Sequence, residues 1–215
     1  MFRDRKDAGE KLAQALMKFE NQGVVVIGIP RGGVEVAYHV ARALKADLSM
    51  IISRKLGHPE NPELAIGAIA EDGSLYLSDL ADSVSQGDLY NVLSREREEI
   101  RRRVQELRDG RPLPDLANKV VVLVDDGIAT GATIYATIKL CRNQHAARVI
   151  VAAPVSSSQS MDKLRKLVDE VCILEVPEMY WAVSQVYKSF TNLEDSEVRN
   201  IMKQWEMEQV QEIRP

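Results

Sequence analysis

The residues best suited to chemistry lie in one short segment, where two adjacent carboxylates precede a small polar loop. Asp125 and Asp126 end the apolar run of residues 120–124, and residues 130–133 (TGAT) open the next helical pattern. A helix start offers free backbone N–H groups and the positive end of a dipole, so it suits a phosphate. Carboxylates repel phosphate and instead suit hydroxyl groups, or a metal ion shared with the ligand. A phosphate at one end and vicinal hydroxyls at the other describe a ribose 5-phosphate.

Other motifs for binding anions or metals do not fit these residues. A Walker A loop requires a Lys before its Ser or Thr, but Ala132 follows Gly131. Residues 28–33 (GIPRGG) lack the glycine spacing of the GxGxxG dinucleotide motif. An EF-hand needs alternating acids and a distal Glu, which this segment lacks. The plain alternative is an acidic strand end followed by a helix cap that binds nothing.

The elements that must position this segment alternate between apolar runs and helical patterns. Short unbroken apolar runs are typical of strands buried on both faces of a parallel sheet, and they occur at residues 24–29, 48–52, 119–124, 149–155 and 171–176. The helical period occurs at residues 7–19, 34–44, 88–108, 132–141, 161–168 and from 196 onward. The sequence therefore predicts an α/β fold, an open and mostly parallel sheet of about five strands with helices on both faces. Ligands of such sheets bind at the carboxyl ends of the strands.

A second, smaller unit is expected beside this sheet. Residues 65–70 and 74–77 flank Asp72-Gly73, which is a strong signal for a two-residue hairpin turn. We expect a single domain over residues 1–215. Its parts are a core at about 24–176, a hairpin or lid at about 55–77, and a C-terminal hood and helix at about 177–210.

Composition and charge exclude several classes of protein. The chain is 45% hydrophobic and 28% charged, as expected of a globular protein with a full core. A net charge of −4 argues against nucleic acid or an anionic membrane as partner. Cys141 and Cys172 lie too far apart to indicate a disulfide framework or a zinc site. The first ten residues lack the apolar centre of a signal peptide, so we expect a cytoplasmic protein.

Residues 120–133 resemble the type I phosphoribosyltransferases. The hallmark of that family for binding 5-phosphoribosyl 1-pyrophosphate (PRPP) is an apolar strand, two acidic residues and a Thr-Gly-x-Thr/Ser loop. The wider pattern of IPRGG, RKLG, VDDGIATGAT and AAPV is similar to a group of phosphoribosyltransferases whose acceptor is unassigned. The resemblance implies that Asp125 and Asp126 hold the ribose hydroxyls. It assigns the 5-phosphate to Ala129, Thr130, Gly131, Ala132 and Thr133. Gly127 departs from the bulky apolar residue often found there, which predicts a looser loop.

The resemblance also implies a pyrophosphate site. Arg31, Gly32 and Gly33 stand where the family has its pyrophosphate loop, in which we expect a non-proline cis peptide near Arg31-Gly32. Arg54 and Lys55 follow the second strand and resemble a pair that neutralises pyrophosphate in several members. Residues 57–73 would then be a mobile loop that closes over the site.

The implied reaction is transfer of the 5-phosphoribosyl group from PRPP to a nitrogen nucleophile, a nucleobase, with release of pyrophosphate. Asp125, Asp126, Arg54 and Lys55 would be the catalytic residues. Mg²⁺ would be carried by PRPP and held through the two aspartates, with no dedicated metal site. Tyr180, and after it Trp181, would stack on the base, although both aromatic residues equally suit the core or a dimer interface.

The acceptor and the activity itself remain open at this point. Ala129 stands where the 6-oxopurine enzymes have an Asp that manages a ring proton, which argues against hypoxanthine and guanine and resembles the adenine enzymes. The alternative function is a regulatory protein that senses PRPP or a nucleotide without turnover. The resemblance further implies a homodimer.

Overall fold

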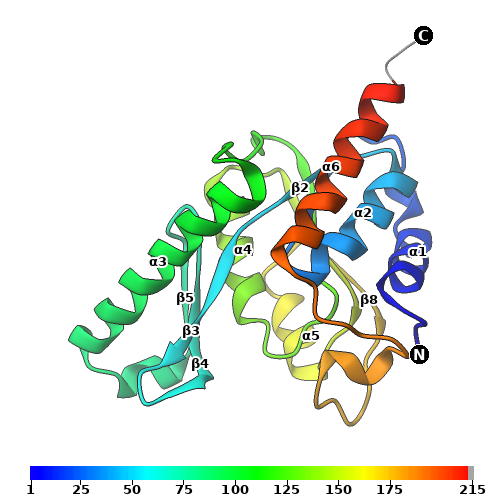
Figure 1. The fold of residues 1–215 in the computed structure, drawn as a ribbon. Coiled ribbons are helices and arrows are strands. Elements are labelled where there is room, and N and C mark those ends of the chain that lie inside the picture. The colour runs from blue at the N-terminus through cyan, green and yellow to red at the C-terminus, as the bar shows by residue number, and fades with distance from the viewer. Residues whose placement is uncertain (213–215) are drawn as a thin grey trace.

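The computed structural model describes residues 1–212, and two separate sheets organise them (Figure 1). The larger sheet is parallel throughout and has the strand order β2-β1-β6-β7-β8. Its strands are β1 (Val25–Gly28), β2 (Asp47–Met50), β6 (Val120–Val124), β7 (Arg148–Val155) and β8 (Glu170–Glu175). Each strand overlaps one of the predicted apolar runs. The predicted α/β fold, with about five parallel strands, is confirmed.

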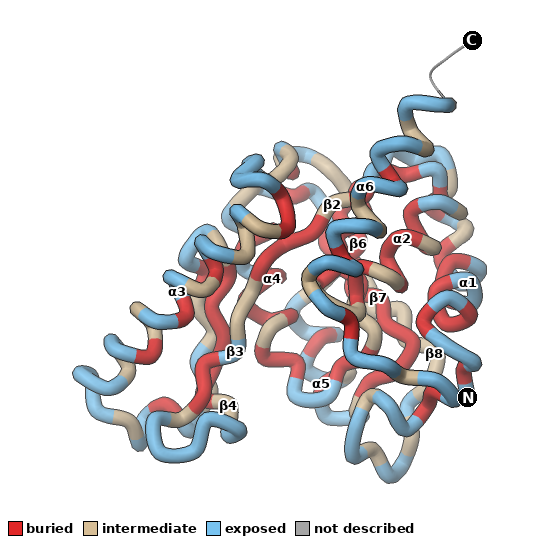
Figure 2. The backbone as a smooth tube through the Cα atoms, in the orientation of Figure 1, coloured by how far each residue is buried: buried red, intermediate tan, exposed pale blue. Residues whose placement is uncertain are grey.

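Helices cover both faces of this sheet because successive strand residues point to opposite sides. Val26 and Val122 pack toward α1 (Arg5–Ala15), α2 (Gly32–Leu44) and α6 (Asp195–Glu212). Ile27 and Leu123 pack toward the opposite helices, α4 (Ala132–Asn143) and α5 (Ser158–Leu164). Figure 2 shows the result as a continuous buried interior beneath exposed outer helix turns. Strands that are buried on both faces explain the unbroken apolar runs in the sequence.

The smaller sheet is antiparallel and forms a lobe beside the parallel sheet (Figure 1). It contains β3 (Ser53–His58), β4 (Asn61–Ala70) and β5 (Leu75–Leu77), and the helix α3 (Gln86–Arg108) packs along it. The predicted hairpin around Asp72-Gly73 is confirmed as the connection between β4 and β5, but its turn has three residues instead of two. The Ala70 N–H donates to the Ser74 carbonyl over 2.9 Å, which leaves residues 71–73 as the turn. A buried ion pair between Arg108 and Glu71 fixes the end of α3 against the end of β4.

Two predictions about local structure were wrong. Residues 57–73 are not a loop, because most of them belong to the paired strands β3 and β4. Irregular pairing around Gly57 lets the polar, proline-containing stretch turn tightly between these strands instead of looping out. The helix predicted at 161–168 is shifted, because Ser157 caps α5 at its start and the helix ends at Leu164.

A hood formed by residues 176–194 follows β8 and packs against the N-terminal segment. The Phe2 N–H donates to the Val186 carbonyl over 2.7 Å, and the Lys188 N–H donates to the Phe2 carbonyl over 2.8 Å. Three short 3₁₀ helices complete the secondary structure of the described residues: η1 (Met17–Phe19), η2 (Asp79–Ser83) and η3 (Val183–Val186). The last three residues of the predicted single domain, 213–215, lie outside the described residues.

Two further properties follow from the helices of residues 1–212. None of these helices combines the length and the apolar character needed to cross a membrane. Cys141 is buried in α4, and this burial raises the pKa of its thiol to about 12. A buried thiol with so high a pKa is inert.

Candidate functional site

The loops after β1 and β6 meet at the carboxyl edge of the parallel sheet. These strands are neighbours, with Gly28 opposite Val124, so residues 30–33 lie directly beside Asp125 and Asp126. The Ile29 N–H donates to the Val124 carbonyl over 2.9 Å and keeps the two loops in register. The non-proline cis peptide bond lies between Pro30 and Arg31, one bond before its predicted position.

The loop that ends at α4 encloses a cavity of about 180 Å³. It is lined by Asp125, Gly127, Ile128, Ala129, Thr130, Gly131, Thr133 and Ile134. Gly131 caps α4 with a φ of 73°, a left-handed conformation that favours glycine. The free N–H groups at the start of this 12-residue helix therefore face a small polar space, as an anion site requires.

Two serines at the start of α5, which sequence reasoning missed, hydrogen-bond to the backbone of the same loop. Ser157 Oγ and Ser160 Oγ donate hydrogen bonds to the Ala129 carbonyl over 2.9 and 2.7 Å. Both belong to the N-terminal end of α5, which follows the neighbouring strand β7. Their role depends on the pairing of β6 with β7, and no local motif marks it.

The two carboxylates have different surroundings. Asp125 lines the loop cavity, and its Oδ1 accepts a hydrogen bond from the Asp126 N–H over 2.9 Å. Asp126 is turned toward the N-terminal helix, where its Oδ2 accepts a hydrogen bond from Arg5 Nε over 2.8 Å. Burial and the neighbouring Asp126 raise the pKa of Asp125 well above its ordinary value. Burial also raises the pKa of Asp126, although the positive charge of Arg5 opposes that change.

The glycines of residues 30–33 allow the two loops to touch. A Cβ atom on Gly32 would overlap the Asp126 carboxylate, and one on Gly33 would lie 2.7 Å from the Val124 carbonyl. Only a residue without a side chain permits so close an approach. Arg31 directly precedes Gly32, and its Nη1 is 3.7 Å from the Glu194 carboxylate.

Arg54 and Lys55 do not share one surface. Both belong to strand β3, and neighbouring strand residues point to opposite faces. Lys55 lines a cleft of about 720 Å³ between the smaller lobe and the hood. Arg54 points toward α3, where its Nε donates a hydrogen bond to the buried Glu96 carboxylate over 3.0 Å. The structure thus brings Lys55, but not Arg54, to the cleft.

The aromatic residues of the hood line the opposite side of this cleft. Trp181 is 84% exposed and therefore has no place in the core of the chain. Tyr180 is half-buried, and within residues 1–212 its buried hydroxyl has no hydrogen-bond partner. Burial, followed by the charges of Asp126 and Asp125, raises the pKa of Tyr180, as expected for a hydroxyl close to the acid pair.

Gly127 does not loosen the loop as the sequence predicted. A Cβ atom there would lie 2.5 Å from a methyl group of Val183 and 2.9 Å from one of Val155. Val183 of the hood therefore fills the space that a bulky residue at position 127 would occupy. The hood and the loop are packed together at this point.

Sequence reasoning also missed two residues that hold Asp126. Arg5 is only 6% exposed, and it reaches Asp126 from 121 positions away in the sequence. The Tyr187 hydroxyl donates to the Asp126 carbonyl over 2.7 Å. Neither residue lies in a motif with Asp126, and only the packing of the N-terminal segment against the hood brings all three together.

The two tyrosine hydroxyls near the acids are expected to differ in their effect on stability. Tyr187→Phe leaves a partly buried carbonyl unpaired and should lower the free energy of unfolding by about 1 kcal/mol. Tyr180→Phe removes a buried hydroxyl without a partner and should leave the free energy of unfolding unchanged or slightly raised. Urea unfolding of both variants tests this. Equal destabilisation by the two substitutions would contradict the difference in hydrogen bonding.

Known proteins resemble this chain over most of its length. The sequence model of the phosphoribosyl transferase domain matches residues 4–190. Two curated Mycobacterium tuberculosis proteins, from different strains, are each 42% identical over 201 residues, and their names assign them provisionally to the phosphoribosyl transferases. The match covers 92% of this chain but 45% of each relative, so the chain spans just under half the length of these relatives.

Solved structures agree with the fold. The crystal structure of TT1426 from Thermus thermophilus is 39% identical in sequence, with a TM-score of 0.81. The alignment covers 95% of this chain and 99% of that protein. The purine phosphoribosyltransferase of Pyrococcus horikoshii is 18% identical with a TM-score of 0.50, covering 88% of this chain and 93% of that one. Similarity at this lower level shows a shared fold alone.

Proposed function

Because the chain belongs to the phosphoribosyl transferase family, a family of glycosyltransferase-type enzymes, we propose that it transfers the 5-phosphoribosyl group of PRPP to a nucleobase. Pyrophosphate is the second product. The observation that carries the proposal is the meeting of three features at one sheet edge. These are the acid pair, the loop of residues 129–133 at the start of α4, and the glycine loop of residues 30–33.

Each feature matches one part of PRPP. The 5-phosphate binds at residues 129–133, where the helix dipole and free N–H groups favour a dianion. Asp125 lines the same cavity and accepts hydrogen bonds from the ribose hydroxyls. The pyrophosphate lies along residues 30–33, where Arg31 supplies a cation. Lys55 lines the larger cleft together with Ala129 and Thr130 and adds a second cation on that side. Arg54 reaches pyrophosphate only after leaving Glu96.

The reaction is a displacement at C1 of the ribose. The lone pair of the acceptor nitrogen forms the new bond to C1, the bond from C1 to the pyrophosphate oxygen breaks and leaves its electron pair on pyrophosphate, and the proton of the acceptor nitrogen passes to solvent. Positive charge that develops on the ring is stabilised by the neighbouring Asp125 carboxylate. Holding both reactants in the right orientation contributes about 7–11 kcal/mol in well-positioned systems.

Magnesium fits this arrangement as a companion of PRPP. Mg²⁺ usually binds through one or two carboxylates and the phosphates of a substrate, and Asp125 is a carboxylate that lines the cavity. When bound, the ion would offset the charge of the leaving pyrophosphate. Among residues 1–212 no three His, Cys, Asp or Glu side chains gather into a metal cluster. In this proposal the ion arrives with the substrate.

The acceptor is proposed to be a planar nitrogen base that stacks against the hood. Tyr180 and Trp181 line the cleft and offer aromatic surface. Ala129 supplies no carboxylate to manage a ring proton, and its carbonyl is already engaged by two serines. This favours a base other than a 6-oxopurine. The homodimer and the cytoplasmic location stay predictions.

The test is pyrophosphate release from Mg-PRPP in the presence of a panel of purines, pyrimidines and related heterocycles. We expect release with one class of base and a loss of release in Asp125→Asn. PRPP binding without release by any base would favour the sensing function instead. Absence of both release and calorimetric PRPP binding would overturn the assignment of residues 125–133.

A further inference from the structure

Arg5 is a buried cation joined to the acid pair from the N-terminal helix. Its Nε donates to Asp126 Oδ2 over 2.8 Å, and its Nη1 donates to the Thr191 carbonyl over 2.8 Å. The centre of its guanidinium group lies 4.0 Å from the centroid of the Phe190 ring. Three contacts on different sides fix the planar group, so Arg5 is not free to swing toward a ligand.

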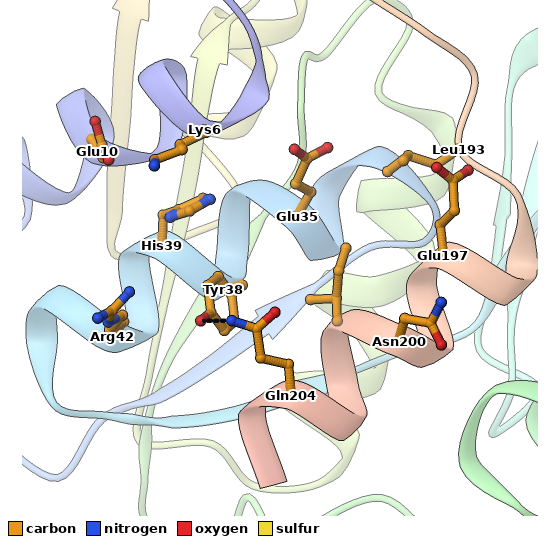
Figure 3. Close-up of a pocket in the computed structure, with 11 residues that line it drawn as sticks. Lys6, Glu10, Glu35, Tyr38, His39, Arg42, Leu193, Glu197, Asn200 and Gln204 are labelled. Atoms are coloured by element: carbon orange, nitrogen blue, oxygen red, sulfur yellow. Dashed lines mark hydrogen bonds between the residues drawn. The ribbon is translucent and has the colours of Figure 1, made fainter. Parts of the chain in front are cut away.

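A second carboxylate lies near Arg5. Glu35 Oε2 is 4.0 Å from Arg5 Nη1, which is longer than the contact with Asp126. Glu35 lines a cavity of about 480 Å³ between α1, α2 and α6, shown in Figure 3. The carboxylate that is hydrogen-bonded to Arg5 is therefore Asp126, and Glu35 adds a weaker attraction.

Asp126 lies under the glycine loop rather than in the loop cavity. The residues that line that cavity include Asp125 but not Asp126. The space for a Cβ on Gly32 is filled by the Asp126 carboxylate and, at 2.7 Å, by Arg5 Nε. The ion pair of Arg5 and Asp126 thus forms the support on which Gly32 rests.

We propose that the two carboxylates have different tasks: Asp125 meets the ribose, while Arg5 is a positioning residue that holds Asp126 beneath Gly32 and so shapes the loop that receives pyrophosphate. The inference rests on the proposed function. Its physical basis is charge as well as shape. An unpaired Asp126 carboxylate would repel an incoming pyrophosphate, and the guanidinium group offsets that negative charge without touching the ligand.

The two tasks can be distinguished by measuring the affinities for two parts of PRPP separately. Calorimetry with Mg²⁺ gives the affinities for inorganic pyrophosphate and for ribose 5-phosphate in the wild type, Arg5→Gln and Asp125→Asn. We expect Arg5→Gln to weaken the affinity for pyrophosphate about tenfold or more and the affinity for ribose 5-phosphate less than about twofold. Asp125→Asn should show the reverse pattern, since it loses a charge-assisted hydrogen bond to the ribose.

Lys6→Gln is the matched control. Lys6 is the next residue of α1, it is exposed, and its substitution removes the same charge. It should bind both ligands as the wild type does. Arg5→Lys retains the charge but not the planar fork, and it should recover most of the pyrophosphate affinity. If Arg5→Gln does not fold, Arg5→Lys decides the question, because the loss of the planar fork should still weaken the affinity for pyrophosphate more than the affinity for ribose 5-phosphate.

Two results would overturn the inference. One is an equal loss of affinity for both ligands in the Arg5 variants, which would indicate a general structural role. The other is a pyrophosphate affinity of Arg5→Gln equal to that of the wild type. Failure of the proposed function looks different, because the wild type and Lys6→Gln would then bind neither ligand.

Discussion

Asp125→Asn is expected to lower the affinity for Mg-PRPP about a hundredfold or more while leaving the free protein folded. An ionised carboxylate accepts hydrogen bonds from hydroxyl groups about twice as strongly as a neutral acceptor does. Asn keeps the shape but turns one acceptor into a donor, and it removes the charge that stabilises a developing cation. Calorimetry of Mg-PRPP binding and the rate of pyrophosphate release measure the two effects.

The same substitution is expected to make the free protein more stable at neutral pH. Burial and the adjacent Asp126 raise the pKa of Asp125 well above that of an unfolded chain. Between those two pKa values the folded state binds more protons than the unfolded state, so the stability of the wild type falls as pH rises. The amide side chain of the variant cannot ionise and is free of this loss. The advantage of the variant should therefore be absent below about pH 4 and complete above the folded pKa.

Urea unfolding between pH 4 and pH 8 tests this pH dependence. Asp162→Asn, which changes an exposed aspartate in α5, is the control and should show no comparable trend. If Asp125→Asn were less stable than the wild type at pH 7, burial would not destabilise the ionised form of Asp125 as we expect. Undiminished PRPP affinity would remove Asp125 from the ligand site.

Gly32→Ala is expected to cost about 1–3 kcal/mol of stability, because its new methyl group overlaps a carboxylate that cannot move freely. Arg5 holds that carboxylate, so relief of the clash requires the ion pair to open. The pyrophosphate affinity should fall together with the stability. Urea unfolding and calorimetry with pyrophosphate measure both quantities.

Gly87→Ala provides the comparison for Gly32→Ala. Gly87 lies in the first turn of α3, and a Cβ there would meet only the Ser85 hydroxyl at 3.9 Å. Alanine is the better helix former, so this variant should be neutral or stabilised by up to about 1 kcal/mol. If both variants were equally stable, the close contact between Gly32 and Asp126 would not exist in solution.

The parallel sheet was predictable because its signal is local. Its three inner strands, β1, β6 and β7, are short and mainly apolar runs, because burial on both faces of the sheet leaves few positions for polar residues. The prediction of a loop at residues 57–73 was wrong because the strands there are not marked by local sequence. The polar start and the prolines of this segment are typical of a loop, and only the pairing of β3 with β4 reveals strands there.

The candidate site likewise contains residues that a local motif reveals and residues that only the fold brings together. Residues 125–133 are contiguous, so one motif reveals the acids and the helix start together. Arg5 and Tyr187 reach Asp126 through tertiary packing, which no spacing in the sequence records. Arg54 and Lys55 are adjacent in the sequence, yet the alternation of a strand sends them to different surfaces.

The paired strands β3 and β4 have a consequence for the entropy of binding. A disordered flap that folds over a ligand loses about 1–2 kcal/mol of backbone freedom for each residue that becomes ordered. These strands already form a ladder and are backed by α3, so that loss belongs to the folding of the chain and not to ligand capture. If β3 and β4 close over a ligand, they would therefore move together with α3 as one packed unit, and little backbone entropy would be lost on binding.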